Sequence, residues 1–103
     1  MAVYMVIEAK VKNQDKYRQY ISAFSDIIPN YGGRCLVRGG RITPFDEEIK
    51  LERRQVEQMV ILEFPSEVNL RRCVSSPEYQ SIMSLRQSGA QTRMVLLEGS
   101  KQG

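Results

Sequence analysis

The chain has 103 residues, with 15 lysines and arginines against 12 aspartates and glutamates, and 42% of its residues are hydrophobic. These values indicate one ordinary globular domain over residues 1–103 and exclude a disordered or membrane-embedded chain. Histidine is absent, which excludes the Ser-His and Cys-His nucleophile pairs and every histidine-containing metal site. We therefore expect neither a metal nor a cofactor.

Cysteine usage and apolar runs bear on the compartment. Cys35 and Cys73 lie far apart without a CxxC spacing, as expected of buried small hydrophobes rather than a redox pair. The first residues resemble no secretory leader, and the longest apolar block, 59–62, is far shorter than the roughly 20 residues of a membrane helix. We expect a cytoplasmic protein that binds no membrane.

Two basic doublets, Arg53-Arg54 and Arg71-Arg72, accompany the net charge of +3. Each lies near a glutamate, and no aromatic residues are interleaved with them. Nucleic-acid binding surfaces commonly combine basic groups with aromatic residues, so we expect no nucleic-acid partner.

The first half of the chain predicts a strand, a helix and an edge strand. Residues 3–11 alternate as a strand with one apolar face: Val3, Met5, Ile7, Ala9 and Val11. Asn13 is placed to cap a helix over about 14–30 whose apolar stripe is Tyr17, Tyr20, Ile21, Phe24 and Ile28. Residues 34–45 predict an edge strand that Gly39-Gly40 interrupts with a bulge.

The second half predicts a hairpin connection, a strand, a broken helix and a last strand. Residues 46–54 read as a solvated connection and 55–64 as a strand, with Val56, Val60, Leu62 and Phe64 on one face and Met59, Ile61 and Glu63 on the other. A helical region over 66–88 is broken in two at Ser76-Pro77-Glu78, where a serine cap and a proline start a new helix. Gly89 ends this helix, and 92–99 form the last strand.

The order β-α-β-β-α-β indicates an α+β fold of the ferredoxin-like kind, with a four-stranded antiparallel sheet and both helices on one face. We expect the strand order 4-1-3-2, with the first and third strands as a parallel central pair. The face without helices carries Tyr4, Val6, Leu36 and Val95. Since a monomer rarely leaves such a face wet, we expect a homodimer that packs sheet to sheet.

Six short motifs, in this order, resemble the uncharacterised family numbered thirteen-thirty among domains of unknown function. They are Tyr31-Gly32-Gly33, Leu36-Val37-Arg38-Gly39-Gly40, Leu62-Glu63-Phe64-Pro65-Ser66, Ser76-Pro77-Glu78-Tyr79-Gln80, Leu85-Arg86 and Val95-Leu96-Leu97-Glu98-Gly99. The resemblance covers about residues 3–99. It implies a homodimer of the dimeric α/β-barrel superfamily, in a family whose activity is not established.

Arg38 is the most informative candidate for ligand binding. An arginine inside a strand, followed by two glycines, places a fork of donors where a carboxylate or enolate can approach. We expect Glu63 to orient this guanidinium and a tyrosine, from Tyr17, Tyr20, Tyr31 or Tyr79, to line the pocket wall. The alternative is a structural ion pair of Arg38 with Glu63 or Glu8.

Two further pairs are candidates for proton transfer or binding. Glu8 and Glu63 would meet at one sheet end if their strands are parallel neighbours, and they would then form an acid/base pair; the alternative is two solvated strand ends. Tyr79 would cap a pocket and Arg86 would draw in an anion. The alternative is that Tyr79 is a core residue and Arg86 a surface residue. Glu63 and Tyr79 are thus the catalytic candidates.

Three classes of function remain open on the sequence. The chain is an enzyme acting on a small organic molecule, a module that binds such a molecule through Arg38, or a structural protein whose main partner is itself. A pocket that brings Arg38, Glu63 and a tyrosine together would favour the first two.

Overall fold

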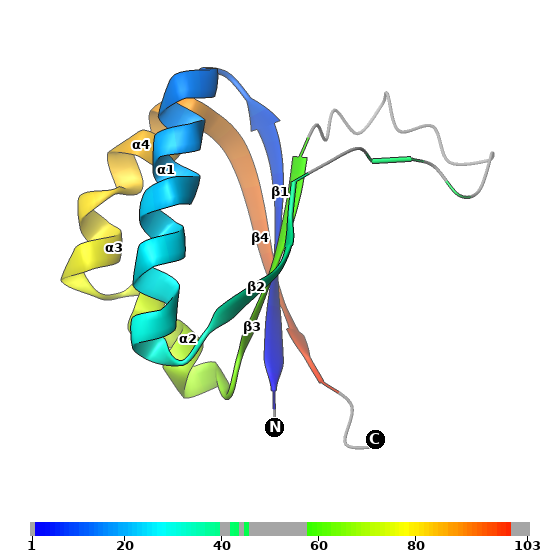
Figure 1. Cartoon of the computed structure of the whole chain (residues 1–103), viewed down its shortest axis with the longest axis vertical. Helices are drawn as coiled ribbons and strands as arrows, with labels where there is room; N and C mark the ends of the chain where they lie inside the picture. The colour runs from blue at the N-terminus through cyan, green and yellow to red at the C-terminus, as the bar shows by residue number, and fades with distance from the viewer. Residues whose placement is uncertain (1, 40–41, 44, 46–57, 100–103) are drawn as a thin grey trace.

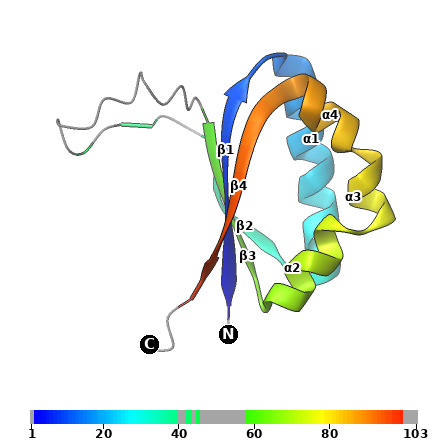
Figure 2. The same ribbon diagram turned by 180° about the vertical axis from the view of Figure 1, so that it is seen from behind.

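The computed structural model of the protein describes residues 2–39, 42–43, 45 and 58–99. The strands form one sheet in the order β2-β3-β1-β4, with all the helices on one side of it (Figure 1; Figure 2). This is the α+β, ferredoxin-like arrangement that the sequence predicts. The elements in chain order are β1 (Val3–Val11), α1 (Gln14–Ile27), the 3-10 helix η1 (Ile28–Tyr31), β2 (Arg34–Arg38), β3 (Gln58–Phe64), α2 (Glu67–Val74), α3 (Pro77–Ser81), α4 (Met83–Gly89) and β4 (Ala90–Glu98).

Every neighbouring pair of strands is antiparallel, including the central pair β1 and β3. The expectation that these two strands are parallel is therefore wrong. The crossover through α1 returns the chain so that β2 runs parallel to β1, and β3 then pairs antiparallel with β2. The strand order and the edge position of β2 are confirmed.

β2 is shorter than predicted, and its bulge lies earlier. The strand ends at Arg38, because Gly39 adopts a φ of 68° and its N–H donates to the Met59 carbonyl at 2.9 Å. The pairing of β2 with β3 shifts between Cys35 and Val37 rather than at Gly39-Gly40. The predicted connection 46–54 lies outside the described residues, as does Val56.

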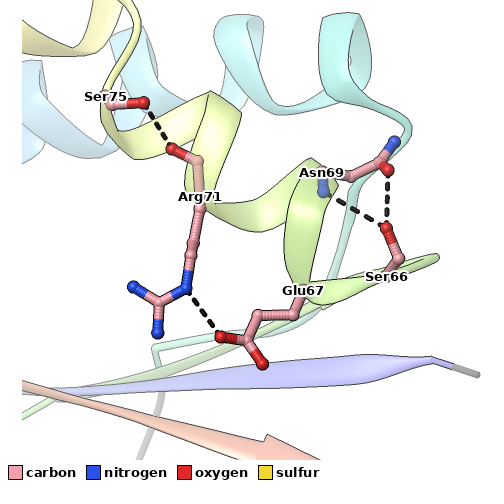
Figure 3. A network of polar contacts seen from close by, with 5 residues as sticks. All are labelled: Ser66, Glu67, Asn69, Arg71 and Ser75. Carbon is pink, nitrogen blue, oxygen red and sulfur yellow. Dashed lines mark hydrogen bonds and ion pairs between the residues drawn. The ribbon is translucent and has the colours of Figure 1, made fainter.

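The second helical region breaks into three helices instead of two. Ser66 and Ser76 cap α2 and α3 through their side chains, and Figure 3 shows the first cap, in which Ser66 Oγ accepts from the Asn69 backbone N–H at 3.2 Å. A further break separates α3 from α4 at Ile82, whose backbone leaves the helical region at φ −105° and ψ 3°. β4 then begins at Ala90, which is earlier than expected.

The core lies between the sheet and the helices. The predicted inward faces are confirmed: β1 buries alternate residues from Val3 to Ala9, and β3 buries Val60, Leu62 and Phe64. The helices cover these side chains with Tyr17, Tyr20, Phe24, Ile27, Ile28, Leu70, Cys73, Tyr79 and Ile82.

The opposite face of the sheet carries a row of aliphatic residues that crosses all four strands. We call this the apolar row; it consists of Val37, Ile61, Val6 and Val95, which stand side by side in the register of the sheet. Each is at least partly exposed, and Val37 retains 45% of its accessible surface. No described element covers this face of the sheet.

Candidate ligand-binding pocket

A pocket of about 460 Å³ lies between α1 and the ends of β2 and β3. We call it the Arg38 pocket. Its wall combines an apolar part with amide, hydroxyl and guanidinium groups. The lining residues are Gln14, Tyr17, Arg18, Ile21 and Ser22 of α1 and Arg38, Gly39, Gln58 and Val60 of the sheet.

One face of α1 supplies the helical wall. Its lining residues are spaced by three and four positions, as on one side of a helix. The stripe that buries Tyr17 therefore also brings the polar neighbours Gln14 and Arg18 to the mouth of the pocket. The N-terminus of α1 is fixed from two sides: the Asn13 side chain accepts from the Lys16 N–H at 3.0 Å, and the Asn13 N–H donates to the Gly89 carbonyl at 3.0 Å.

The bulge in β2 places Arg34 and Arg38 on opposite faces of the sheet. In a regular strand Arg34 and Arg38, four residues apart, would share one face. The register shift instead places Arg34 opposite Glu63, on the face without helices, and Arg38 opposite Val60, on the helix side. Because of the extra residue, Arg34 and Arg38 lie on opposite faces, and Arg38 lines the pocket together with residues of α1.

Glu63 does not orient Arg38, contrary to the expectation from the sequence. Its carboxylate accepts a hydrogen bond from Arg34 Nε at 2.6 Å on the open face. This hydrogen bond holds the pKa of the Glu63 carboxyl below its ordinary value. Glu63 in turn raises the pKa of Tyr4, its neighbour on β1, through a hydrogen bond and its charge. Glu63 is therefore part of a surface cluster and not of the Arg38 pocket.

Glu8 and Glu63 do not meet. Because β1 and β3 are antiparallel, Glu63 lies opposite Tyr4, whereas Glu8 lies opposite Met59. Four residues of β1 separate the two positions, about 13 Å at 3.3 Å per residue. The acid/base pair expected from a parallel arrangement is wrong for this physical reason.

Tyr79 and Arg86 come together, but in the core. Arg86 Nη1 donates to the Tyr79 hydroxyl at 3.0 Å, and the Tyr79 and Tyr20 hydroxyls share a hydrogen bond of 2.9 Å. Burial is the main cause of a raised pKa at Tyr20. None of these three residues lines the Arg38 pocket. Tyr79 is thus a core residue, as the alternative interpretation states. Arg86 is half-buried and hydrogen-bonded, so it is not a free surface arginine.

Of the four candidate tyrosines, only Tyr17 lines the Arg38 pocket. Tyr31 lies elsewhere and donates to the Glu78 carboxylate at 3.1 Å. Tyr17 is 3% exposed, and within the described part of the chain its hydroxyl has no hydrogen-bond partner. Burial raises the pKa of this hydroxyl and so disfavours the deprotonated form, which alone could act as a base.

Among the described residues of the pocket wall, the charged ones are both cations, Arg18 and Arg38. Arg18 also makes an exposed ion pair with Asp15 at 3.7 Å. Arg38 is exposed, and among the described residues no ion pair to it is found, so the alternative of a structural pair with Glu63 or Glu8 has no support. An unpaired guanidinium beside apolar and amide groups is suited to bind an anion on an organic body.

The sequence interpretation missed Gln14, Arg18 and Gln58. The first two follow the helical spacing of Tyr17 and Ile21, so a closer examination of the polar neighbours of that stripe would have indicated them. Gln58 had no comparable signal. In the described residues no group of three or more metal-ligating side chains occurs, and no described helix is long and apolar enough to cross a membrane.

Comparison with known proteins identifies a family model and solved structures of the same fold. The model described as a domain of unknown function, DUF1330, matches residues 2–100. No curated protein matches the chain.

Three solved structures illustrate the likeness of fold. The protein of unknown function RPA0582 from Rhodopseudomonas palustris is 14% identical with a TM-score of 0.73, over 97% of this chain and 83% of that one. A dimeric ferredoxin-like protein of unknown function from Jannaschia sp. CCS1 is 14% identical with a TM-score of 0.74, over 96% and 100%. SnoaB, a cofactor-independent oxygenase from Streptomyces nogalater, is 11% identical with a TM-score of 0.66, over 97% and 94%.

Proposed function

We propose that this chain, which belongs to the DUF1330 family, is a homodimer that binds a small organic acid in the Arg38 pocket. The observation that carries the proposal is the position of Arg38. Arg38 pairs with Val60 on the helix side of the sheet and lines a cavity of about 460 Å³, and among the described residues no ion pair to it is found. We place the protein in the cytoplasm on the sequence grounds given above.

The wall chemistry supports an acid with an apolar body. Ile21 and Val60 offer aliphatic surface, and Gln14 and Gln58 offer amide donors and acceptors. The described lining contains no carboxylate, so nothing in it repels a negative charge or stands ready to accept a proton. These groups favour binding over proton transfer, although one structure of similar fold is named as a cofactor-independent oxygenase.

The apolar row supports the homodimer. An antiparallel sheet with one face in water normally places polar residues there, whereas four aliphatic side chains cross this face. Leu97 extends the apolar surface beyond the row with 54% of its area exposed. A second copy would cover this face with an identical one, and a structure of similar fold is described as dimeric.

The binding proposal is tested by thermal unfolding with a panel of small carboxylic acids at neutral pH. A bound acid raises the unfolding temperature because it binds the folded state alone. We expect Arg38→Gln to fold normally and to weaken the binding of every active acid by about tenfold or more, as loss of a charge-assisted hydrogen bond predicts. Arg72→Gln, an exposed arginine of α2 outside the pocket, is the charge-matched control and retains binding.

Two results would overturn the proposal. Equal binding by the Arg38→Gln variant would place the acid elsewhere. Failure of every acid in the panel would leave the alternative class, a structural protein whose main partner is itself.

A further inference from the structure

A second cavity, of about 350 Å³, lies directly beside the Arg38 pocket. It is lined by Val11, Lys12, Gln14 and Gln58. Gln14 and Gln58 also line the Arg38 pocket, so the two cavities share these side chains as a common wall. We call the two neighbouring cavities the groove; both are lined by Gln14, the first residue of α1.

The groove has a cation in each part. Arg38 and Arg18 line the first cavity and Lys12 lines the second. Lys12 is exposed, and within the described ranges no ion pair to it occurs. No described residue that lines either cavity is acidic. The groove therefore has at least one cation in each cavity.

The backbone beneath Lys12 is anchored. Its N–H donates to the Gly89 carbonyl at 2.8 Å, and the next residue, Asn13, donates to the same carbonyl at 3.0 Å. Gly89 itself packs against α1 so closely that a Cβ there would lie 2.7 Å from the Tyr17 nitrogen. The base of the lysine thus has a fixed place relative to α1 and to the Arg38 pocket.

The shared wall offers hydrogen bonds along the middle of the groove. The side-chain amides of Gln14 and Gln58 have no hydrogen-bond partner in the part of the chain that the structure describes. The Gln58 Oε1 atom lies beside Gly39, 3.7 Å from the place that a Cβ would take. Such amides accept from and donate to polar groups of a ligand that passes between them.

We infer that the groove binds a linear dicarboxylic acid, with one carboxylate at Arg38 and the other at Lys12. This inference rests on the proposed function, because the first carboxylate occupies the Arg38 pocket. It goes further because it gives the ligand a second carboxylate and assigns Lys12 as the residue that selects for it. A monocarboxylate fills only the first half of the site.

Calorimetric titration tests this with straight-chain dicarboxylates from butanedioate to decanedioate, each compared with the monocarboxylate of equal length. For the best-fitting chain length, we expect the wild type to bind the dicarboxylate about tenfold more tightly than the monocarboxylate of equal length. This is the gain typical of one added charged contact. Lys12→Gln should remove this preference and leave monocarboxylate binding unchanged. Arg38→Gln should weaken both ligands.

Lys16→Gln is the matched control, since it removes one positive charge from α1 outside both cavities. It should retain the preference, which separates a contact at Lys12 from a general effect of net charge. Equal affinity for both ligands in the wild type, with loss in Arg38→Gln, would overturn the inference and keep the proposed function. If none of the acids binds, both the inference and the proposed function are overturned.

Discussion

The buried tyrosines show how two identical side chains differ in what their hydroxyls contribute. Tyr79 accepts from Arg86 and shares a hydrogen bond with Tyr20, whereas the Tyr17 hydroxyl is buried without a described partner. A buried hydroxyl without a partner costs free energy, and a satisfied one does not. The first hydroxyl therefore stabilises the core and the second does not.

We predict opposite results for the same chemical change at these two positions. Tyr79→Phe removes the hydroxyl to which Tyr20 and Arg86 are hydrogen-bonded and should lower the free energy of unfolding by about 1–3 kcal/mol. Tyr17→Phe should leave it within about 0.5 kcal/mol or raise it. Urea unfolding of both variants measures this, and a larger loss in Tyr17→Phe would contradict the assignment.

The Arg34–Glu63 pair makes the open face sensitive to acid. The pKa of Glu63 is lowered in the folded state, so its contribution to stability is fully present above the unfolded value of 4.5 and is lost as pH falls through the lower, folded pKa. We predict that Glu63→Gln is less stable than the wild type at neutral pH and that the difference shrinks below pH 4.5. Urea unfolding across this range is the measurement; a constant difference would contradict the account.

At the scale of elements, the bulge of β2 separates the two arginines of that strand. Cys35 pairs with Leu62 and Val37 pairs with Ile61, so Leu36 is the extra residue. Removing Leu36 would leave a regular strand in which every other pair, including Arg38 with Val60, keeps its partner. The side on which Arg38 lies would not change.

We predict that deletion of Leu36 gives a folded protein that binds small acids within about threefold of the wild type, because Leu36 is 44% exposed and β2 is an edge strand. Insertion of one alanine between Val37 and Arg38 should move Arg38 to the other face and weaken binding by about tenfold or more. Titration of one acid into both variants checks this. Loss of binding on deletion, with the fold intact, would contradict the assigned register.

The sequence predicted the elements that alternate or repeat strongly. The apolar faces of β1 and β3 and the stripe of α1 were read correctly, because burial on one side leaves a periodic pattern. The place of the bulge was not predicted correctly, since nothing in the pattern of apolar residues distinguishes Leu36-Val37 from the neighbouring residues of the strand. The pairing of Arg38 with Glu63 was therefore wrong, and the assumed parallel pair wrongly brought Glu8 and Glu63 together.

For the whole molecule, the exposed aliphatic face is the surface through which we propose that two copies pair. Four aliphatic residues cross it in the apolar row, and the helices lie on the other side (Figure 2). Removing apolar surface from water contributes about 25 cal/mol per Å², and part of this gain offsets the entropy that two copies lose when they associate. A charge placed in the row would remain unpaired in that interface.

We predict that the protein sediments as a dimer and that Ile61→Lys gives either the 11.9 kDa monomer or an unfolded chain. Val68→Lys is the matched control, because Val68 is 58% exposed on α2, on the helix side, and the dimer should tolerate a charge there. Sedimentation equilibrium with circular dichroism measures both properties. A wild type that is monomeric at every concentration would contradict the dimer.

The Arg38 pocket is the binding site that we propose for a small organic acid. The most direct test is a titration followed by the backbone amide resonances of the labelled protein, with the tightest acid of the panel. We predict that the largest shifts fall on the Arg38 pocket, at residues 14–22 of α1 and at Arg38, Gly39 and Gln58. Shifts concentrated on the apolar row, or none at saturating acid, would contradict it.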